Sequence, residues 1–140
     1  MHRLQLSTPA RFAIAYVLGM TTTIPWIFYV SELGRPVVQR VIQKLNLDRY
    51  ELAVFERVLL RLEAQEQTWH DSTHLGKEIW EARIRLINRQ IRLLYSLELA
   101  GAIHLALLAA VKKTQKVPQQ WIALAISRRS NWRARVEEIG

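Results

Sequence analysis

Hydrophobic positions in this chain gather into two long runs. Residues 12–30 contain no charged side chain, and residues 93–111 form a second run of the same length that carries Glu98 and His104. About 20 apolar residues in an α-helix cross a hydrocarbon core of about 30 Å. The pattern therefore predicts two membrane-embedded helices.

Between these runs the apolar positions follow a helical period. Over residues 38–69 they recur in alternating steps of three and four, which is typical of helices packed side by side as in a coiled coil. Asp48 interrupts this seam, and Glu51 three residues later completes a possible capping box, so we expect one helix to end near Asn46 and another to begin. A similar seam covers residues 80–98, and the polar residues 70–76 between the seams favour a turn. The two seams predict an antiparallel helical hairpin.

The last segment, after Pro118, is short of the length needed to cross a membrane. Its tryptophans and arginines predict an amphipathic helix that lies in the membrane interface. Gly101, between two alanines, would let helices approach closely in lipid. We expect contacts with lipid or with partner proteins from Glu98, Gly101, Trp121, Arg128, Arg129 and Trp132.

The predicted fold class is therefore all-α, with two membrane-embedded helices joined by a charged hairpin and followed by an amphipathic C-terminal helix. The predicted regions are an N-terminal membrane anchor (1–31), the amphipathic hairpin (32–92), a second membrane segment (93–116) and a basic amphipathic tail (117–140).

Charge adds to this picture through its distribution. The formal net charge is +8, and residues 112–140 carry seven basic and two acidic side chains. Basic residues next to an apolar segment attract anionic lipid headgroups. Because the charge flanks apolar segments and does not form a separate basic domain, we expect membrane lipids as partners and no nucleic acid. The chain has no cysteine, which excludes disulfides and thiolate nucleophiles.

One spacing points to metal chemistry. Glu66, His70, His74 and Glu78 recur every four residues and would form a stripe of ligands on a continuous helix. The polar residues around Asp71 favour a turn, which would separate His70 from His74, so we predict no metal site. No motif for a cofactor or for catalysis occurs in the sequence, and we expect the protein not to be an enzyme.

Ionisable residues at membrane depth are costly and are functional candidates. For Glu98 and His104 we favour a structural role, packed against protein, over a proton or ion pathway.

The function predicted from these patterns is that of a non-catalytic accessory or scaffold subunit of a larger membrane complex. One alternative is a self-assembling pore-forming or membrane-remodelling protein, which would form homo-oligomers. A second alternative is a soluble four-helix-bundle interaction protein with both apolar runs in its core. The predicted location is an integral membrane position in the mitochondrial or bacterial inner membrane, between which the sequence does not decide.

Overall fold

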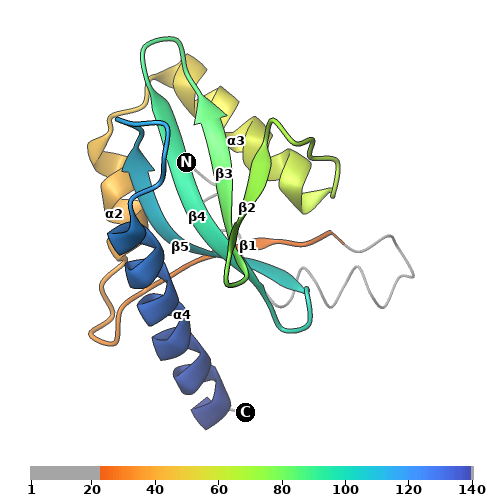
Figure 1. The fold of residues 1–140 in the computed structure, drawn as a ribbon, viewed down its shortest axis with the longest axis vertical. Helices are drawn as coiled ribbons and strands as arrows, with labels where there is room; N and C mark the ends of the chain where they lie inside the picture. The colour runs from red at the N-terminus through yellow and green to blue at the C-terminus, as the bar shows by residue number, and fades with distance from the viewer. Residues whose placement is uncertain (1–22, 140) are drawn as a thin grey trace.

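The centre of the molecule is a twisted sheet with helices on both of its faces (Figure 1). The computed structural model describes residues 23–139. Within these residues, five strands lie in the order β1-β5-β4-β3-β2, and the β1–β5 pair is parallel whereas the other pairs are antiparallel. Their bounds are Trp26–Phe28 (β1), Ser72–Gly76 (β2), Ile79–Arg85 (β3), Gln90–Glu98 (β4) and Ile103–Val111 (β5).

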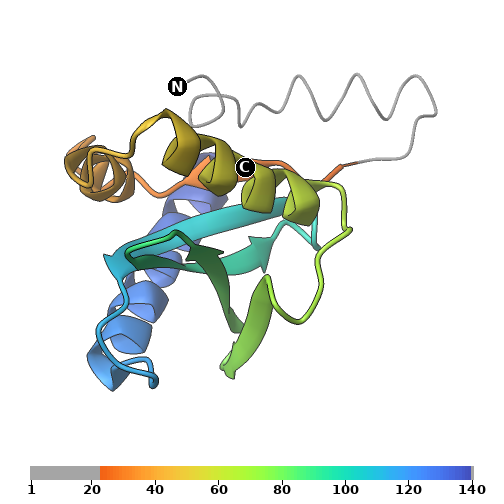
Figure 2. The same cartoon turned by 90° about the horizontal axis from the view of Figure 1, so that it is seen from above.

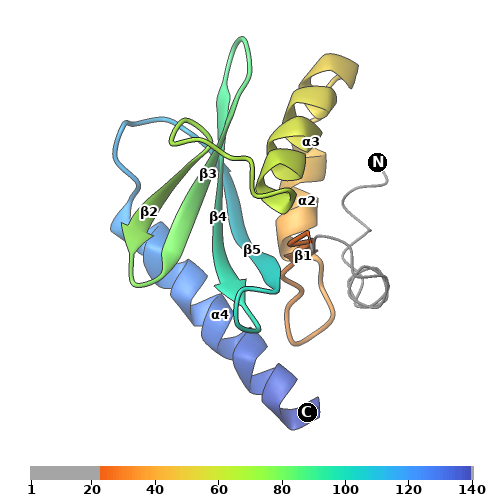
Figure 3. The same cartoon turned by 90° about the vertical axis from the view of Figure 1, so that its right-hand side faces the viewer.

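The helices divide between the two faces. Helices α2 (Val37–Lys44) and α3 (Arg49–Glu63) cover one face, whereas α4 (Gln119–Ile139) crosses the other face obliquely (Figures 2 and 3). Helix α4 contacts β3, β4 and β5. Both faces of the central strands are thus partly covered.

The start of α3 agrees with the sequence pattern. The Asp48 carboxylate accepts a hydrogen bond from the Glu51 N–H at 2.8 Å, and the Glu51 carboxylate accepts one from the Asp48 N–H at 3.1 Å. This is the reciprocal capping box. Asn46 takes a positive φ of 50° between α2 and α3. The predicted capping box and the break near residue 46 are confirmed.

The buried side of α3 faces the sheet. Phe55, Leu59 and Leu62 are at most 2% exposed and belong to the central hydrophobic cluster. The indole N–H of Trp26 on β1 donates to the Leu59 carbonyl at 3.1 Å, which satisfies a polar group that burial would otherwise leave without a partner. The predicted apolar seam of α3 is therefore part of a helix–sheet core.

The second apolar run corrects the sequence-based interpretation. Residues 93–111 do not form a membrane helix: they supply most of β4, a tight turn and all of β5. Leu99, Ala100 and Gly101 all have positive φ in that turn. Central strands that are buried on both faces lose the alternation of apolar and polar residues, so their sequence resembles an apolar helix.

The second helical seam is also absent. Residues 80–98 lie in β3, a turn and β4, with Ile84 directly opposite Ile91 in the register. Trp80, Ala82 and Ile84 alternate with charged residues, so the period of two competed with the helical period in the sequence. Ile87, expected in a buried seam, is 82% exposed at the turn.

The all-α fold with two membrane helices is wrong, and the fold is mixed α/β. Trp26–Phe28, inside the first apolar run, is a β-strand, and residues 12–22 of that run lie outside the described residues. Over residues 23–139, none of the helices combines the length and the apolar character needed to span a bilayer. The predicted C-terminal helix is present as α4, but it packs on the sheet.

Candidate functional site

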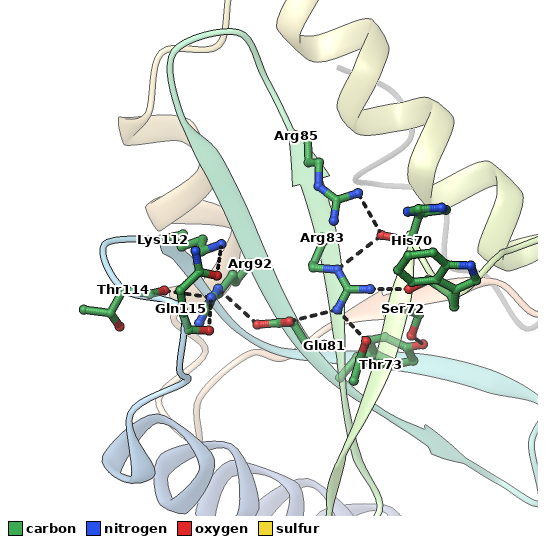
Figure 4. Close-up of polar contacts among 12 residues, drawn as sticks. His70, Ser72, Thr73, Glu81, Arg83, Arg85, Arg92, Lys112, Thr114 and Gln115 are labelled. Carbon is green, nitrogen blue, oxygen red and sulfur yellow. Dashed lines mark hydrogen bonds and ion pairs between the residues drawn. The ribbon is translucent and has the colours of Figure 1, made fainter.

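Polar and charged side chains collect on one end of the sheet face that α4 crosses. Alternate residues of a strand point to the same face, so Glu81, Arg83 and Arg85 of β3 lie together. Arg92 on β4 is directly opposite Arg83 in the register. Arg92 also shares its face with Glu98, six residues further along β4, where α4 covers the sheet. Among residues 23–139, no helix lies over the end of this face near Arg83 and Arg85 (Figure 4).

Two like charges directly opposite each other on a sheet are destabilising. Here Glu81 lies between them: its Oε1 is 3.4 Å from Arg83 Nη1, and its Oε2 is 3.1 Å from Arg92 Nε (Figure 4). We call Glu81, Arg83, Arg85 and Arg92 the arginine cluster. Its one carboxylate compensates for one of three guanidinium groups, so the cluster carries a surplus of positive charge.

Arg83 and Arg85 organise the chain before β2. Arg83 donates from Nε to the His70 carbonyl at 3.2 Å, from Nη2 to the Trp69 carbonyl and from Nη1 to the Thr73 hydroxyl. Arg85 Nη1 donates to the same His70 carbonyl at 3.3 Å. The two arginines therefore hold residues 69–73 beside the cluster.

The turn around Trp69 and His70 is also tied to α3. Asp71 receives two hydrogen bonds from Arg61, at 2.7 and 3.0 Å. The side-chain hydrogen bond from Arg61 lowers the pKa of Asp71 below its ordinary value and thus keeps the carboxylate charged. Trp69 is 74% exposed, and its ring centroid lies 3.5 Å from that of His70. An exposed aromatic pair thus borders the arginine cluster.

On the opposite side of the cluster lies the connection from β5 to α4, residues 112–118, which we call the lysine segment. Arg92 Nη2 donates to the carbonyls of Thr114 and Gln115 at 2.8 and 2.7 Å. The segment brings three lysines to this end of the sheet: Lys112, Lys113 and Lys116. The arginine cluster is consequently bordered by further positive charge.

A different set of titratable groups is buried under α2 and α3. The His104 ring stacks on Trp26 with centroids 4.6 Å apart, and its Nδ1 is 2.8 Å from the Ile24 carbonyl. Burial lowers the pKa of His104 to about 4 and raises that of Tyr95 to about 12. Both groups are therefore neutral near pH 7, and their hydrogen bonds go to uncharged partners, the Ile24 carbonyl and the Ser72 hydroxyl.

The predicted metal-type residues do not share a helix. His70 lies in the turn before β2, and His74 lies in β2 with its ring 4.8 Å from that of Trp80. Within residues 23–139, no three His, Cys, Asp or Glu side chains come together as a metal site would require.

The residues predicted to contact partners lie on or against α4, except one. Glu98 accepts two hydrogen bonds from Arg133, at 2.7 and 3.0 Å. Arg128 donates to the Leu107 carbonyl and Arg129 to the Lys77 carbonyl, at 2.7 and 2.8 Å. Gly101 lies in the β4–β5 turn at φ 85°. Trp121 and Trp132 pack partly against the core. Contact of these residues with a partner protein stays a prediction.

The arginine cluster was missed by the helical interpretation of residues 80–98. The signal that could have found it is the alternation Glu81-Ala82-Arg83-Ile84-Arg85, which places the charged residues on one face of a strand.

One protein family matches this chain. Its description is "Phage derived protein Gp49-like (DUF891)", and the match covers residues 40–130, from α2 into α4 and including the arginine cluster. No curated protein matches the chain.

The predicted roles as a subunit of a membrane complex or as a pore former are wrong, as are the lipid partners and the inner-membrane location, because they rested on two membrane helices that neither the fold nor this family supports. The four-helix-bundle alternative is wrong because the core is a sheet. Since the match covers more than half of the 140 residues, the chain belongs to the Phage derived protein Gp49-like family.

Proposed function

We propose that the uncovered end of the sheet binds a single-stranded nucleic acid. The observation that carries this proposal is the meeting of Arg83, Arg85 and the lysine segment on one face, with Glu81 as the acidic member of the cluster. Arginine and lysine bind phosphate oxygens, and these contacts supply most of the affinity of such complexes. The expectation that nucleic acid is not a partner rested on positive charge next to predicted membrane helices. Residues 93–111 form strands instead of such a helix, so that reason no longer holds.

The form of the ligand follows from the aromatic border. Bases of a single strand can stack on exposed rings, whereas bases inside a duplex are not free to do so. Trp69 is largely exposed, and its backbone carbonyl is held by Arg83. A strand whose phosphates contact Arg85 and the lysine segment would thus have a ring within reach for one base.

The test is fluorescence polarisation with labelled single-stranded RNA and DNA oligonucleotides, measured over a range of salt concentrations. Arg85→Ala and a Lys113→Ala/Lys116→Ala variant should weaken binding and reduce the magnitude of the salt slope by about 0.7 for each phosphate that the variant no longer neutralises. The matched control removes the same charge from α2, on the other face, as Arg40→Ala and Lys44→Ala.

Trp69→Ala should weaken binding by about 1–3 kcal/mol without changing the salt slope, because stacking releases no counterions. Equal losses in the α2 variants and in the cluster variants would contradict a site on this face and indicate attraction to the net charge of the whole protein. A comparison of RNA with DNA then identifies which strand is preferred.

A second candidate function is cleavage of RNA at the same face. It is favoured by His70, an exposed residue whose carbonyl accepts hydrogen bonds from both Arg83 and Arg85. An imidazole can take the proton of a 2′-hydroxyl while the 2′-oxygen attacks the adjacent phosphorus. The 5′-oxygen then leaves, takes a proton from water to become a 5′-hydroxyl, and a 2′,3′-cyclic phosphate remains, while guanidinium groups stabilise the charge that develops on the phosphoryl oxygens.

The expectation that the chain is not an enzyme stays a prediction, and one assay decides between it and this candidate. Cleavage requires a fragment that ends in a cyclic phosphate, no product from a 2′-deoxy substrate, and loss of product in His70→Ala with binding retained. Intact RNA after long incubation at saturating protein would leave binding as the function.

A further inference from the structure

The buried part of the arginine cluster cannot be the part that touches a ligand. Arg92 is 3% exposed and Glu81 is 4% exposed. Burying an ion pair costs several kcal/mol per ion in desolvation, which its mutual attraction offsets only when the geometry is good. Arg92 Nε and Glu81 Oε2 approach to 3.1 Å, and within the described residues neither atom has a hydrogen-bond partner beyond this contact. The Glu81–Arg92 pair is therefore poor evidence of a gain in stability, and the contacts that the two residues make indicate a role other than stabilisation.

The other end of Arg92 indicates that role. Its Nη2 donates to two consecutive carbonyls, those of Thr114 and Gln115, in the middle of the lysine segment. The ends of the segment are held separately, by the hydrogen bond from the Lys112 N–H to the Gln90 carbonyl at 2.7 Å and by the buried side chain of Val117. Among the side chains of the sheet that the structure describes, Arg92 is thus the one that ties down the middle of the segment.

Glu81 connects Arg92, and through it the lysine segment, to Arg83 on the neighbouring strand. One of its carboxylate oxygens contacts Arg92 and the other contacts Arg83, which in turn holds the Trp69–Thr73 stretch. The lysine segment, the buried pair and the aromatic border therefore form one connected set of contacts across β4, β3 and β2 (Figure 4).

We propose that Glu81 and Arg92 are positioning residues that hold the lysine segment and the Trp69–Thr73 stretch on either side of the nucleic-acid face. This inference rests on the proposed function. Lys112, Lys113 and Lys116 are held at the rim of the sheet, so a bound strand does not meet the full entropic cost of ordering them.

The variant Glu81→Gln separates positioning from simple electrostatics. A buried carboxylate near a phosphate site repels the ligand, so its neutralisation alone would tighten binding. If Glu81 positions the arginines, the same change weakens binding, because the amide no longer attracts both guanidinium groups. The two accounts thus predict opposite signs for one measurement.

Arg92→Lys tests the other member of the pair. Lysine keeps the positive charge but lacks the planar group that reaches Glu81 and two carbonyls together. In the free protein, trypsin cleavage after Lys113 and Lys116 should accelerate by about tenfold for the loss of one charge-assisted hydrogen bond that holds this segment in place. Oligonucleotide affinity should fall by about threefold to tenfold. The magnitude of the salt slope should decrease by up to about 2, which is the contribution expected if the three lysines each neutralise one phosphate.

The matched control is Arg133→Lys, which alters the Glu98–Arg133 ion pair on the same face, where the carboxylate is buried and the arginine is partly exposed. It should leave trypsin cleavage in the lysine segment and oligonucleotide affinity unchanged. Thermal melts show which variants fold, and Glu81→Gln replaces Arg92→Lys if the latter does not. Unchanged trypsin cleavage in the segment, or tighter binding by Glu81→Gln, overturns the inference.

The two proposals fail in different ways. If Arg85→Ala and the lysine variants bind as well as the native chain, the proposed function is wrong, whatever happens to trypsin cleavage of the segment. If those variants weaken binding but Arg92→Lys and Glu81→Gln do not, the nucleic-acid face stands and the positioning role is wrong.

Discussion

Two buried carboxylates on the same face of the sheet have opposite surroundings. Glu98, at the end covered by α4, receives both of its hydrogen bonds from the single guanidinium group of Arg133. Glu81, at the uncovered end, is shared between Arg83 and Arg92 at 3.4 and 3.1 Å. The first arrangement is a closed, neutral pair, and the second leaves positive charge in excess.

The difference lies in where the arginine comes from. Arg133 belongs to a helix that closes the face, and its side chain remains 44% exposed to solvent, so water still reaches the pair. Arg92 belongs to the sheet itself and is buried beneath the lysine segment. A glutamate–arginine pair thus holds α4 on the sheet at one end, and a second such pair lies beneath a positively charged surface at the other end.

The largest effect on stability is expected when the arginine of each pair, Arg92 or Arg133, is replaced. Arg92→Met should destabilise the protein by about 3–5 kcal/mol, because it leaves the buried Glu81 carboxylate with a more distant partner and two backbone carbonyls without a donor. Arg133→Met should cost about 1–2 kcal/mol, since water can solvate part of Glu98. Urea unfolding followed by circular dichroism measures both, and an equal or reversed order would contradict the distinction between the two ends.

A buried group that has no charged partner sharpens the comparison. The pKa of His104 falls from 6.5 to about 4 on folding because burial disfavours the imidazolium form. Between these values the unfolded chain binds more protons than the folded one. The contribution of His104 to the free energy of unfolding is therefore fully present above pH 6.5 and is lost as the pH drops toward 4. The loss from this one group should approach about 3 kcal/mol.

His104→Gln, which has no titration in this range, should flatten the dependence between pH 6.5 and 4 in urea unfolding experiments. The Asp71–Arg61 pair acts in the next window. Because its carboxylate pKa is lowered in the folded state, that contribution is present above pH 3.8 and is lost below it. A pH profile that is identical in His104→Gln and the native chain would show that the imidazole is not buried in its neutral form.

The smallest effect is expected from Glu98→Leu. Arg133 is free to turn into solvent when its partner is removed, and leucine suits a buried position, so stability should stay within about 1 kcal/mol of the native value. Oligonucleotide affinity should also be unchanged. A loss of several kcal/mol would mean that the Glu98–Arg133 pair is a major fastening of α4.

The sequence predicted some local features and missed the sheet. Asp48 and Glu51 are sufficient to specify the start of α3, because the capping box uses atoms three residues apart. The long apolar run predicted a helix through Leu99 to Gly101, and these residues form the turn between β4 and β5. No local signal outweighed the hydrophobic length of that run. The arginine cluster was missed for the same reason, since Arg83 meets Arg92 only when β3 pairs with β4.

What the sequence determined by itself is therefore short in range: the capping box before α3, the helix after Pro118, and the concentration of positive charge in the last part of the chain. The tertiary structure decided whether residues 93–111 form a helix or strands, because burial on both faces by α2, α3 and α4 removes the alternation that marks a strand. It also decided which charges meet. Glu81, Arg92 and the lysine segment come from separate stretches of the chain, and only strand pairing places them within bonding distance.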